Sequence, residues 1–154
     1  MRKKILIIGG SGFVGSNLIS IIKPANCINF DKVQSKFFPK ITQIVDIRDK
    51  NSLKINYEIS CVILLAAEHK DNIKPSSLYY DVNVQGTKNV LEFMSNNNIN
   101  HLIFTSSVAV YGLNKSNPNE EKNPDPFNHY GKSKLLAEDL IRKWYEQDTN
   151  NKIV

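Results

Sequence analysis

The sequence predicts an α/β fold in which helices cover both faces of a doubly wound parallel sheet. Short runs of β-branched and other apolar residues alternate along the chain with segments whose apolar residues recur at helical spacing. The short runs lack the strict alternation of a strand with one wet face, which indicates strands buried on both faces. A glycine-rich turn also joins the first run to the first helical segment. Such a sheet requires one domain with alternating strands and helices.

The expected elements follow in a regular order. Residues Lys4–Ile8 form a compact apolar run that ends in glycine, and Phe13–Ile22 shows helical spacing until Pro24 stops it. Further strands are expected at residues 25–30, 41–45, 60–65 and 100–104, and long helices at 76–95 and 127–147. Residues 31–40 and 112–126 lack an apolar period and are expected to be loops.

The composition of the chain limits its class. Its 154 residues, 41% of them hydrophobic, are enough for one domain with a buried core. The formal net charge is +5, but the 20 basic residues are scattered and form no run typical of a nucleic-acid arm. A phosphate-bearing small molecule accounts for the positive balance equally well, so we expect no nucleic-acid partner. No apolar run is long enough to span a membrane, so we expect no membrane partner.

The cysteines and histidines indicate no metal site. Cys27 and Cys61 each stand beside apolar, strand-like residues, and the sequence has no C-x-x-C pair and no histidine at ligand spacing. We therefore expect no bound metal. Two buried free thiols favour a cytoplasmic location, where thiols stay reduced.

The stretch IIGGSGFVG at residues 7–15 contains two glycine patterns at once. Counted from Gly10 it reads G-x-G-x-x-G, and counted from Gly9 it reads G-x-x-G-x-x-G. Both occur where a strand turns into a helix beneath a phosphate, which lies on free N–H groups at the helix N-terminus. Asp31 ends the next predicted strand, about 20 residues further on, where a carboxylate binds a ribose and repels a 2′-phosphate. This context predicts a Rossmann-type site that prefers NAD to NADP, with Lys32 the one feature against that preference.

A tyrosine and a lysine open the last predicted helix. Tyr130 and Lys134 stand four residues apart, so both project from one face of that helix. A lysine ammonium beside a phenol favours the phenolate, the form needed to take a proton from a sugar hydroxyl. The serines that end the fifth predicted strand offer a hydrogen bond to the same oxygen.

Small residues end the fourth predicted strand, in the run Leu65, Ala66 and Ala67. Small side chains there let a flat cofactor approach the backbone, although core packing explains them equally well. The charged run Glu68, His69 and Lys70 that follows is expected to be a solvated loop.

With these residues in order, the chain resembles the extended short-chain dehydrogenase/reductase family, in particular its NAD-dependent nucleotide-sugar epimerases and dehydratases. The likeness covers essentially all 154 residues. The family's glycine register is G-x-x-G-x-x-G, which the resemblance places at Gly9, Gly12 and Gly15. Gly10 is then an extra small residue of the turn. Residues 79–87 are similar to the epimerase helix that carries N-x-x-G-T, and residues 104–112 to the strand that ends in S-S-x-x-V-Y-G.

The resemblance implies a role for each matching residue. The catalytic set is Ser107, Tyr130 and Lys134. The implied cofactor is NAD, with Asp46 and Ile47 flanking the adenine and Asn83 touching the cofactor. The complete set of implied cofactor residues is Gly9, Gly12, Phe13, Val14, Gly15, Asp31, Asp46, Ile47, Leu65, Ala66, Ala67, Asn83, Tyr130 and Lys134.

The reaction implied by the resemblance is a transient oxidation of a nucleotide sugar at C4. Tyr130 would take the hydroxyl proton while a hydride passes to the nicotinamide, and Lys134 would hold a ribose hydroxyl. A UDP-sugar is the expected substrate, a homodimer the expected assembly of the full-length form, and polysaccharide biosynthesis the expected context. Family members continue into a C-terminal substrate domain. We therefore expect residues 1–154 to be an NAD-binding domain truncated at the start of its sixth strand, Lys152 to Val154, with the substrate domain absent.

Several alternatives stay open at this point. A 4,6-dehydratase of this family carries Asp-Glu just after the catalytic Ser or Thr, where this chain has Val108 and Ala109, so an epimerase is preferred. A keto-sugar reductase is not excluded by that difference. A non-catalytic NAD-binding module is the alternative of another class, although such regulators generally lack the tyrosine and the lysine. An inactive N-terminal fragment is a further alternative.

Overall fold

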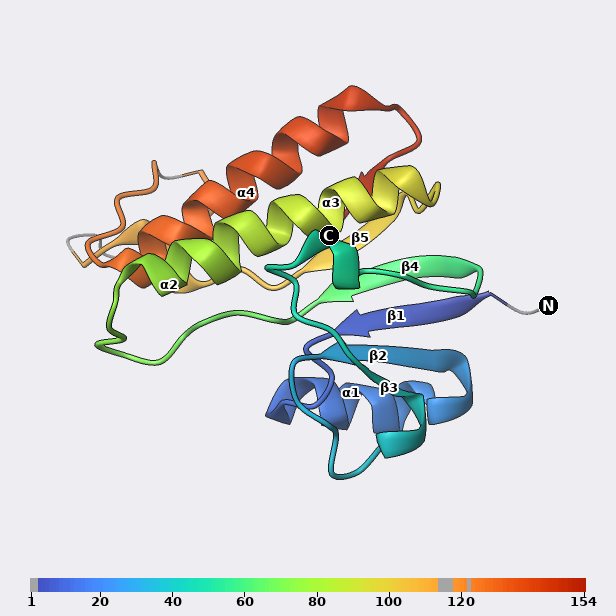
Figure 1. The fold of residues 1–154 in the computed structure, drawn as a ribbon. Coiled ribbons are helices and arrows are strands. Elements are labelled where there is room, and N and C mark those ends of the chain that lie inside the picture. The colour runs from blue at the N-terminus through green and yellow to red at the C-terminus, as the bar shows by residue number, and fades with distance from the viewer. Residues whose placement is uncertain (1–2, 114–117, 122) are drawn as a thin grey trace.

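The computed structural model of the chain describes residues 3–113, 118–121 and 123–154. These residues form a parallel sheet of six strands in the order β3-β2-β1-β4-β5-β6 (Figure 1). The strands are β1 (Lys4–Ile8), β2 (Cys27–Asp31), β3 (Thr42–Ile44), β4 (Ile59–Leu64), β5 (His101–Phe104) and β6 (Lys152–Ile153). The predicted doubly wound sheet is confirmed, and the strand order reverses direction between β1 and β4.

Helices cover both faces of this sheet. Helix α1 (Phe13–Ile22) lies on one face, and α3 (Thr87–Asn96) and α4 (His129–Gln147) lie side by side on the other (Figure 1). No helix within the described residues combines the length and the apolar character needed to cross a membrane.

The two faces of the central strand β1 belong to different cores. Ile7 packs with Ile19 of α1 in the smaller core. Leu6 and Ile8 pack on the opposite face in the larger core, which includes Val90 of α3. Burial on both faces explains why this strand reads as a continuous apolar run.

Helices α3 and α4 are joined by apolar packing and by one polar contact. The buried residues of α4 that face the larger core are Ile141 and Trp144. The Trp144 indole N–H donates a hydrogen bond to the Ser95 hydroxyl of α3 at 3.0 Å. Leu136, which the apolar period placed on the buried face, is instead 44% exposed.

The helix predicted over residues 76–95 contains a widened turn. It runs from α2 (Ser77–Tyr80) through a π-helical segment (Asp81–Gly86) into α3. The Thr87 hydroxyl donates to the Asn83 carbonyl at 2.7 Å within this segment. π-helical turns are rare and are concentrated at functional sites. Periodicity alone indicates a helix here and does not reveal the extra residue.

The other predicted boundaries shift by a few residues. Strand β2 begins at Cys27 because Pro24–Asn26 forms a 3₁₀ turn, and β3 begins late because Pro39–Ile41 does the same. Helix α4 begins at His129, where the Asn128 side chain accepts a hydrogen bond from the Gly131 N–H at 2.7 Å. Residues 114–117 and 122 of the predicted loop at 112–126 lie outside the described residues.

Candidate functional site

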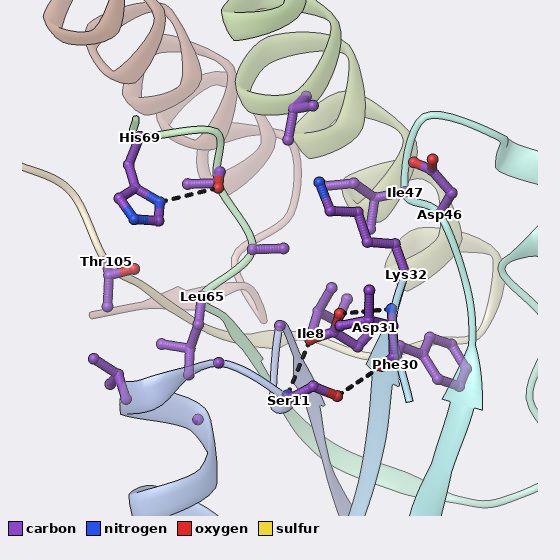
Figure 2. Close-up of a pocket in the computed structure, with 18 of the residues that line it drawn as sticks. Ile8, Ser11, Phe30, Asp31, Lys32, Asp46, Ile47, Leu65, His69 and Thr105 are labelled. Atoms are coloured by element: carbon purple, nitrogen blue, oxygen red, sulfur yellow. Dashed lines mark hydrogen bonds between the residues drawn. The ribbon is translucent and has the colours of Figure 1, made fainter. Parts of the chain in front are cut away.

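A cavity of about 690 Å³ lies at the carboxyl ends of the strands (Figure 2). Open parallel sheets bind their ligands at this edge, where the strand order reverses. Most predicted site residues line the cavity: Gly9, Gly12, Phe13, Val14, Gly15, Asp31, Asp46, Ile47, Leu65, Ala66, Ala67, Tyr130 and Lys134. Ser107 and Asn83 are not among its lining residues.

Two glycines are required by the shape of the turn itself. Gly9 has a φ of +94°, and a Cβ there would lie 2.6 Å from the Ala66 nitrogen. A Cβ on Gly15 would lie 2.4 Å from the Cα of Gly10, so α1 can start this close to the turn only without a side chain. Gly12 differs, because the nearest atom to its Cβ position is the Gly9 carbonyl oxygen at 3.5 Å. Nothing within the protein requires glycine at position 12, whereas a ligand in the cavity would.

Gly10 has a structural role of its own. The buried Asn29 of β2 accepts a hydrogen bond from the Gly10 N–H at 2.9 Å and donates to the Ser11 hydroxyl at 3.1 Å. A Cβ on Gly10 would lie 2.4 Å from the Asn29 side-chain oxygen. Asn29 therefore fastens the turn to β2 through this glycine, which is more than an extra turn residue.

The N-terminus of α1 faces the cavity without a side-chain cap. Gly12 is the N-cap residue and makes no side-chain hydrogen bond. Phe13 and Val14 line the cavity and are 86% and 58% exposed. The first N–H groups of a helix carry its positive dipole end and have no partners within the helix. This geometry fits the diphosphate of a dinucleotide.

Asp31 lies at the carboxyl end of β2, beside the glycine turn (Figure 2). One carboxylate oxygen accepts from the Ser11 N–H at 2.9 Å, and the other accepts from the Val33 N–H at 3.0 Å. Each oxygen has a second lone pair available, so the carboxylate is oriented by the backbone and still able to accept from a ribose hydroxyl.

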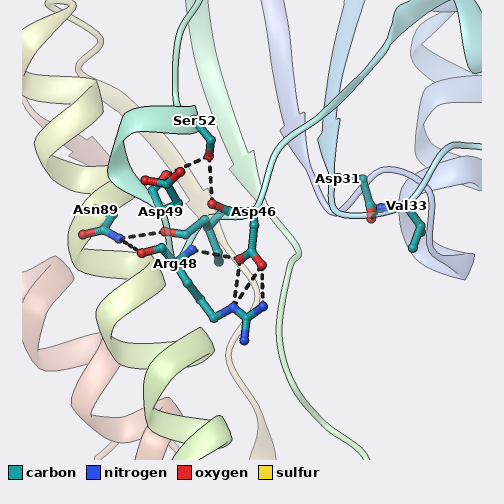
Figure 3. Close-up of polar contacts among 8 residues, drawn as sticks. Asp31, Val33, Asp46, Arg48, Asp49, Ser52 and Asn89 are labelled. Atoms are coloured by element: carbon teal, nitrogen blue, oxygen red, sulfur yellow. Dashed lines mark hydrogen bonds and ion pairs between the residues drawn. The ribbon is translucent and has the colours of Figure 1, made fainter.

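Asp46 and Ile47 follow β3 at the end of the cavity farthest from Tyr130 along the sheet order (Figure 3). Ile47 is 5% exposed and packs against the position where Gly86 lacks a side chain. The Asp46 carboxylate pairs with the Arg48 guanidinium, with Nη2 to Oδ2 at 2.5 Å. This hydrogen-bonded ion pair lowers the pKa of Asp46.

Small residues bring the backbone after β4 close to the glycine turn. The N–H groups of Leu65 and Ala66 donate to the Ile8 carbonyl at 2.8 and 2.9 Å. Ala66 and Ala67 add little side-chain volume where they line the cavity. The exposed His69 also lines it, with Nδ1 3.5 Å from the Ala67 carbonyl oxygen (Figure 2).

Lys134 is a buried cation at the catalytic end of the cavity. Its side chain is 2% exposed, and Nζ donates to the Thr105 carbonyl at 2.5 Å. Nζ also lies 4.0 Å from the centre of the Phe104 ring. Burial lowers the pKa of Lys134 to about 8, and the carboxylate of Glu138, one turn further along α4, opposes that shift. An ammonium has three donors, so Lys134 can also bind hydroxyls inside the cavity.

Tyr130 lies on α4, one turn before Lys134, and lines the same cavity. Of the two serines after β5, Ser106 lines the cavity, and its hydroxyl donates to Glu138. Ser107 caps the 3₁₀ turn Val108–Tyr111, and its hydroxyl accepts from the Ala109 N–H at 3.2 Å. The structure thus brings Tyr130 and Lys134 together at the cavity and places Ser107 one residue beyond its lining.

Asn83 lies behind the cavity, in the π-helical segment. It is 2% exposed, and its carboxamide accepts from the Glu68 N–H at 2.8 Å and donates to the Glu68 carbonyl at 3.0 Å. It also donates to the Ser133 hydroxyl at 2.8 Å, which in turn donates to the Tyr130 carbonyl at 2.7 Å. Asn83 therefore joins the loop after β4 to the start of α4. Its contact with a cofactor stays a prediction.

Sequence reasoning missed several residues that shape the cavity. Asn89 of α3 donates to the carbonyls of Ile47 and Arg48 at 2.8 and 3.0 Å and so holds the segment after β3. The signal for Arg48 was its position two residues after an aspartate, which is a spacing for a local turn. The signal for Asn29 was a polar residue within an otherwise apolar strand.

A family model described as "NAD dependent epimerase/dehydratase family" matches residues 5–154. The chain belongs to this family. The match covers the glycine turn, the end of every strand from β1 to β5 and the tyrosine and lysine of α4. The family predicted from the motifs is thereby confirmed, and its members are enzymes that depend on NAD.

Curated relatives share this half of their sequence with the chain. It is 56% identical over 149 residues to N-acetyl-alpha-D-glucosaminyl-diphospho-ditrans,octacis-undecaprenol 4-epimerase of Escherichia coli O157:H7, covering 96% of this chain and 45% of that protein. It is 31% identical over 175 residues to UDP-glucose 4-epimerase 2 of Oryza sativa subsp. japonica, covering 99% and 43%. The chain spans about half the length of the curated relatives that it matches.

Solved structures show the same fold with the cofactor bound. UDP-glucose 4-epimerase from Brucella ovis in complex with NAD superposes with a TM-score of 0.87 at 26% identity, covering 99% of this chain and 50% of that one. The UDP-glucose 4-epimerase from Thermus thermophilus, also in complex with NAD, gives 0.87 at 25% identity, covering 97% and 53%. The predicted Rossmann-type fold and the predicted cofactor class are confirmed.

Proposed function

We propose that this chain is the NAD-binding and proton-transferring part of a 4-epimerase that acts on a sugar joined to a diphosphate. One observation carries the proposal: Tyr130 and Lys134 line the same cavity as the uncapped N-terminus of α1. A diphosphate site and an acid–base pair are therefore parts of one binding site, as a dinucleotide-dependent reaction at a hydroxyl requires.

The cavity residues fit NAD in order along the sheet edge. The turn from Gly9 to Gly15 would hold the diphosphate, and the space at Gly12 lets it approach the backbone. Asp31 would bind the adenosine ribose, and Lys134 the other ribose. When bound, NAD accepts a hydride from a sugar carbon and later returns it.

The protein's own part of the chemistry is to move one proton and to hold it while the sugar turns over. Tyr130 is placed to take the proton of the 4-hydroxyl as phenolate and to return it to the new oxygen. The buried charge of Lys134 favours the phenolate, because the cavity walls screen it less than water would. A ketone that rotates between these two steps receives its hydride on the other face.

Two carriers of the sugar are candidates, and a different relative favours each. The rice relative supports a UDP-sugar, which agrees with the expectation from the motifs. The Escherichia coli O157:H7 relative, at 56% identity, supports a sugar on diphospho-undecaprenol. Both substrates share a sugar on a diphosphate, and the residues of this chain near the reaction meet only that shared part.

Cofactor binding is tested on the chain itself. Titration calorimetry with NAD and NADP should show binding of NAD and at least about tenfold weaker binding of NADP, because Asp31 repels a 2′-phosphate. Absence of NAD binding by the folded chain would refute the proposal.

Catalysis is tested in a chimera in which this chain replaces the matching segment of the Escherichia coli O157:H7 4-epimerase. We expect C4 epimerisation of UDP-glucose or of N-acetylglucosaminyl-diphospho-undecaprenol, and the substrate used identifies the carrier. Tyr130→Phe should lower kcat by about 10²–10⁴-fold without weakening NAD binding. Tyr145→Phe, at a tyrosine 47% exposed on the same helix, is the matched control and should leave kcat unchanged. Turnover that survives Tyr130→Phe would contradict the assigned role.

We also propose a cytoplasmic, polysaccharide-forming context and a homodimer for the complete enzyme. Cys27 and Cys61 are free thiols on the strands that flank β1 on either side, which supports a reducing compartment. Light scattering on the chimera measures the assembly, and a monomer would contradict the dimer.

A further inference from the structure

The base end of the cavity contains an ion pair that the proposed chemistry does not use. Strand order places it: the segment after β3 follows Asp31 of β2, which in turn follows the glycine turn after β1. A dinucleotide with its diphosphate at the turn and one ribose at Asp31 has its purine base after β3. The residues there that line the cavity are Val45, Asp46, Ile47 and Arg48.

The segment after β3 is held in one shape by hydrogen bonds from two sides (Figure 3). The Ser52 hydroxyl donates to the Asp46 carbonyl at 2.9 Å, and the Arg48 N–H donates to the Asp46 carboxylate at 3.0 Å. Asn89, which is 4% exposed, donates to the carbonyls of Ile47 and Arg48. The two charged side chains therefore start from fixed backbone.

The Arg48 guanidinium holds the Asp46 carboxylate from one side. Nε lies 3.0 Å from both carboxylate oxygens, and Nη2 lies 2.5 Å from Oδ2. A carboxylate has about four lone-pair positions, and these contacts with the Arg48 N–H leave at least one of them free. The charged groups near Asp46 are Arg48 and Lys32, and both keep it ionised. Asp46 is thus an oriented acceptor that cannot act as a donor.

We propose that Arg48 is a positioning residue that makes Asp46 a selective acceptor for the 6-amino group of a purine base. The inference rests on the proposed NAD site. An adenine would donate its amino hydrogen to the free lone pair, with its ring against the apolar Val45 and Ile47. A hypoxanthine base presents a carbonyl oxygen at the same place, which the carboxylate repels.

The test measures the binding of NAD and of nicotinamide hypoxanthine dinucleotide to the full chain by calorimetry. Wild type should bind NAD about 10- to 100-fold more tightly, the range for one hydrogen bond to a charged group. In Arg48→Gln this preference should fall below about threefold, while Arg48→Lys should retain part of it. Arg142→Gln is the matched control, since Arg142 forms only an exposed pair with Asp139 on α4.

A double-mutant cycle separates positioning from direct contact. If Arg48 acts through Asp46, Arg48→Gln should change NAD affinity by less than about twofold in an Asp46→Ala background. An equal loss of affinity for both dinucleotides in Arg48→Gln, or a full effect without Asp46, would overturn the inference. Melting curves of every variant exclude unfolding as the cause. Absence of NAD binding by wild type would remove the proposed function together with this inference, whereas NAD binding without base preference would remove the inference alone.

Discussion

At the base end of the cavity the principal ion pair joins residues close in sequence, whereas at the catalytic end the contacts join distant segments. Asp46 and Arg48 are two residues apart. At the other end, the Lys134 ammonium reaches a carbonyl 29 residues away, and Asn83 reaches a hydroxyl 50 residues away. The base end therefore depends mostly on a local turn, and the catalytic end on correct packing of α4 against β5 and the π-helical segment.

The glycine turn lies between these two ends, and its loss should have the largest effect. Gly15→Val places a side chain where even a Cβ would lie 2.4 Å from the Gly10 Cα, so α1 must move away from β1. We expect the free energy of unfolding to fall by more than about 3 kcal/mol and NAD binding to disappear. Urea unfolding followed by circular dichroism measures the first effect. A variant as stable as wild type would show that the turn tolerates displacement.

The buried ammonium should make the stability of the catalytic end depend on pH. The pKa of Lys134 is about 8 in the folded chain against an ordinary value of 10.5. Between these values the unfolded chain holds a proton that the folded chain has released, so stability should rise with pH through this window, by about 3 kcal/mol in total. The difference in unfolding free energy between wild type and Lys134→Met, measured from pH 7 to 11, isolates this contribution. A difference that does not change with pH would contradict a lowered pKa.

Two buried asparagines allow a matched comparison of the ends. Asn83→Ala removes three hydrogen bonds that join the loop after β4 to α4, and should cost about 2 kcal/mol of stability and slow turnover in the chimera. Asn89→Ala releases the two carbonyls after β3, and should cost about 1–2 kcal/mol and weaken NAD binding with kcat unchanged. Thermal unfolding and steady-state kinetics distinguish them. The same kinetic pattern in both variants would mean that the two ends are not separable.

The smallest effect is expected from Gly12→Ala, where the protein has room for a methyl group. Stability should change by less than about 1 kcal/mol, in contrast to Gly15→Val. NAD affinity should nevertheless fall by about tenfold, since the methyl group would stand where a diphosphate approaches the backbone. Calorimetric titration of the folded variant measures this loss. Unchanged affinity would place the diphosphate elsewhere in the turn.

The sequence was most informative where function depends on backbone shape. Glycines at fixed spacing after a strand, and an aspartate at the end of the next strand, predicted the turn and the position of Asp31 correctly. Strands and helices were found because burial on two faces leaves continuous apolar runs. The resemblance added Asp46 and Ile47, which composition and periodicity do not reveal.

What the sequence could not show depends on contacts across the sheet. Asn83 is buried in hydrogen bonds to Glu68 and Ser133, and no spacing rule predicts a pair 50 residues apart. The π-helical segment escaped detection because one extra residue barely disturbs an apolar period of 3.6. Ser107 lies one residue beyond the cavity lining because the chain turns into a 3₁₀ helix directly after β5.

The hydrogen bond between Trp144 and Ser95 has a practical consequence for all of these measurements. Trp144 is the one tryptophan of the chain, and it lies between α3 and α4, outside the cavity lining. Its intrinsic fluorescence is therefore a reporter of helix packing, and the emission of reduced nicotinamide gives a separate optical signal for the cavity. A single sample can thus reveal whether a substitution empties the binding site or loosens the scaffold beneath it.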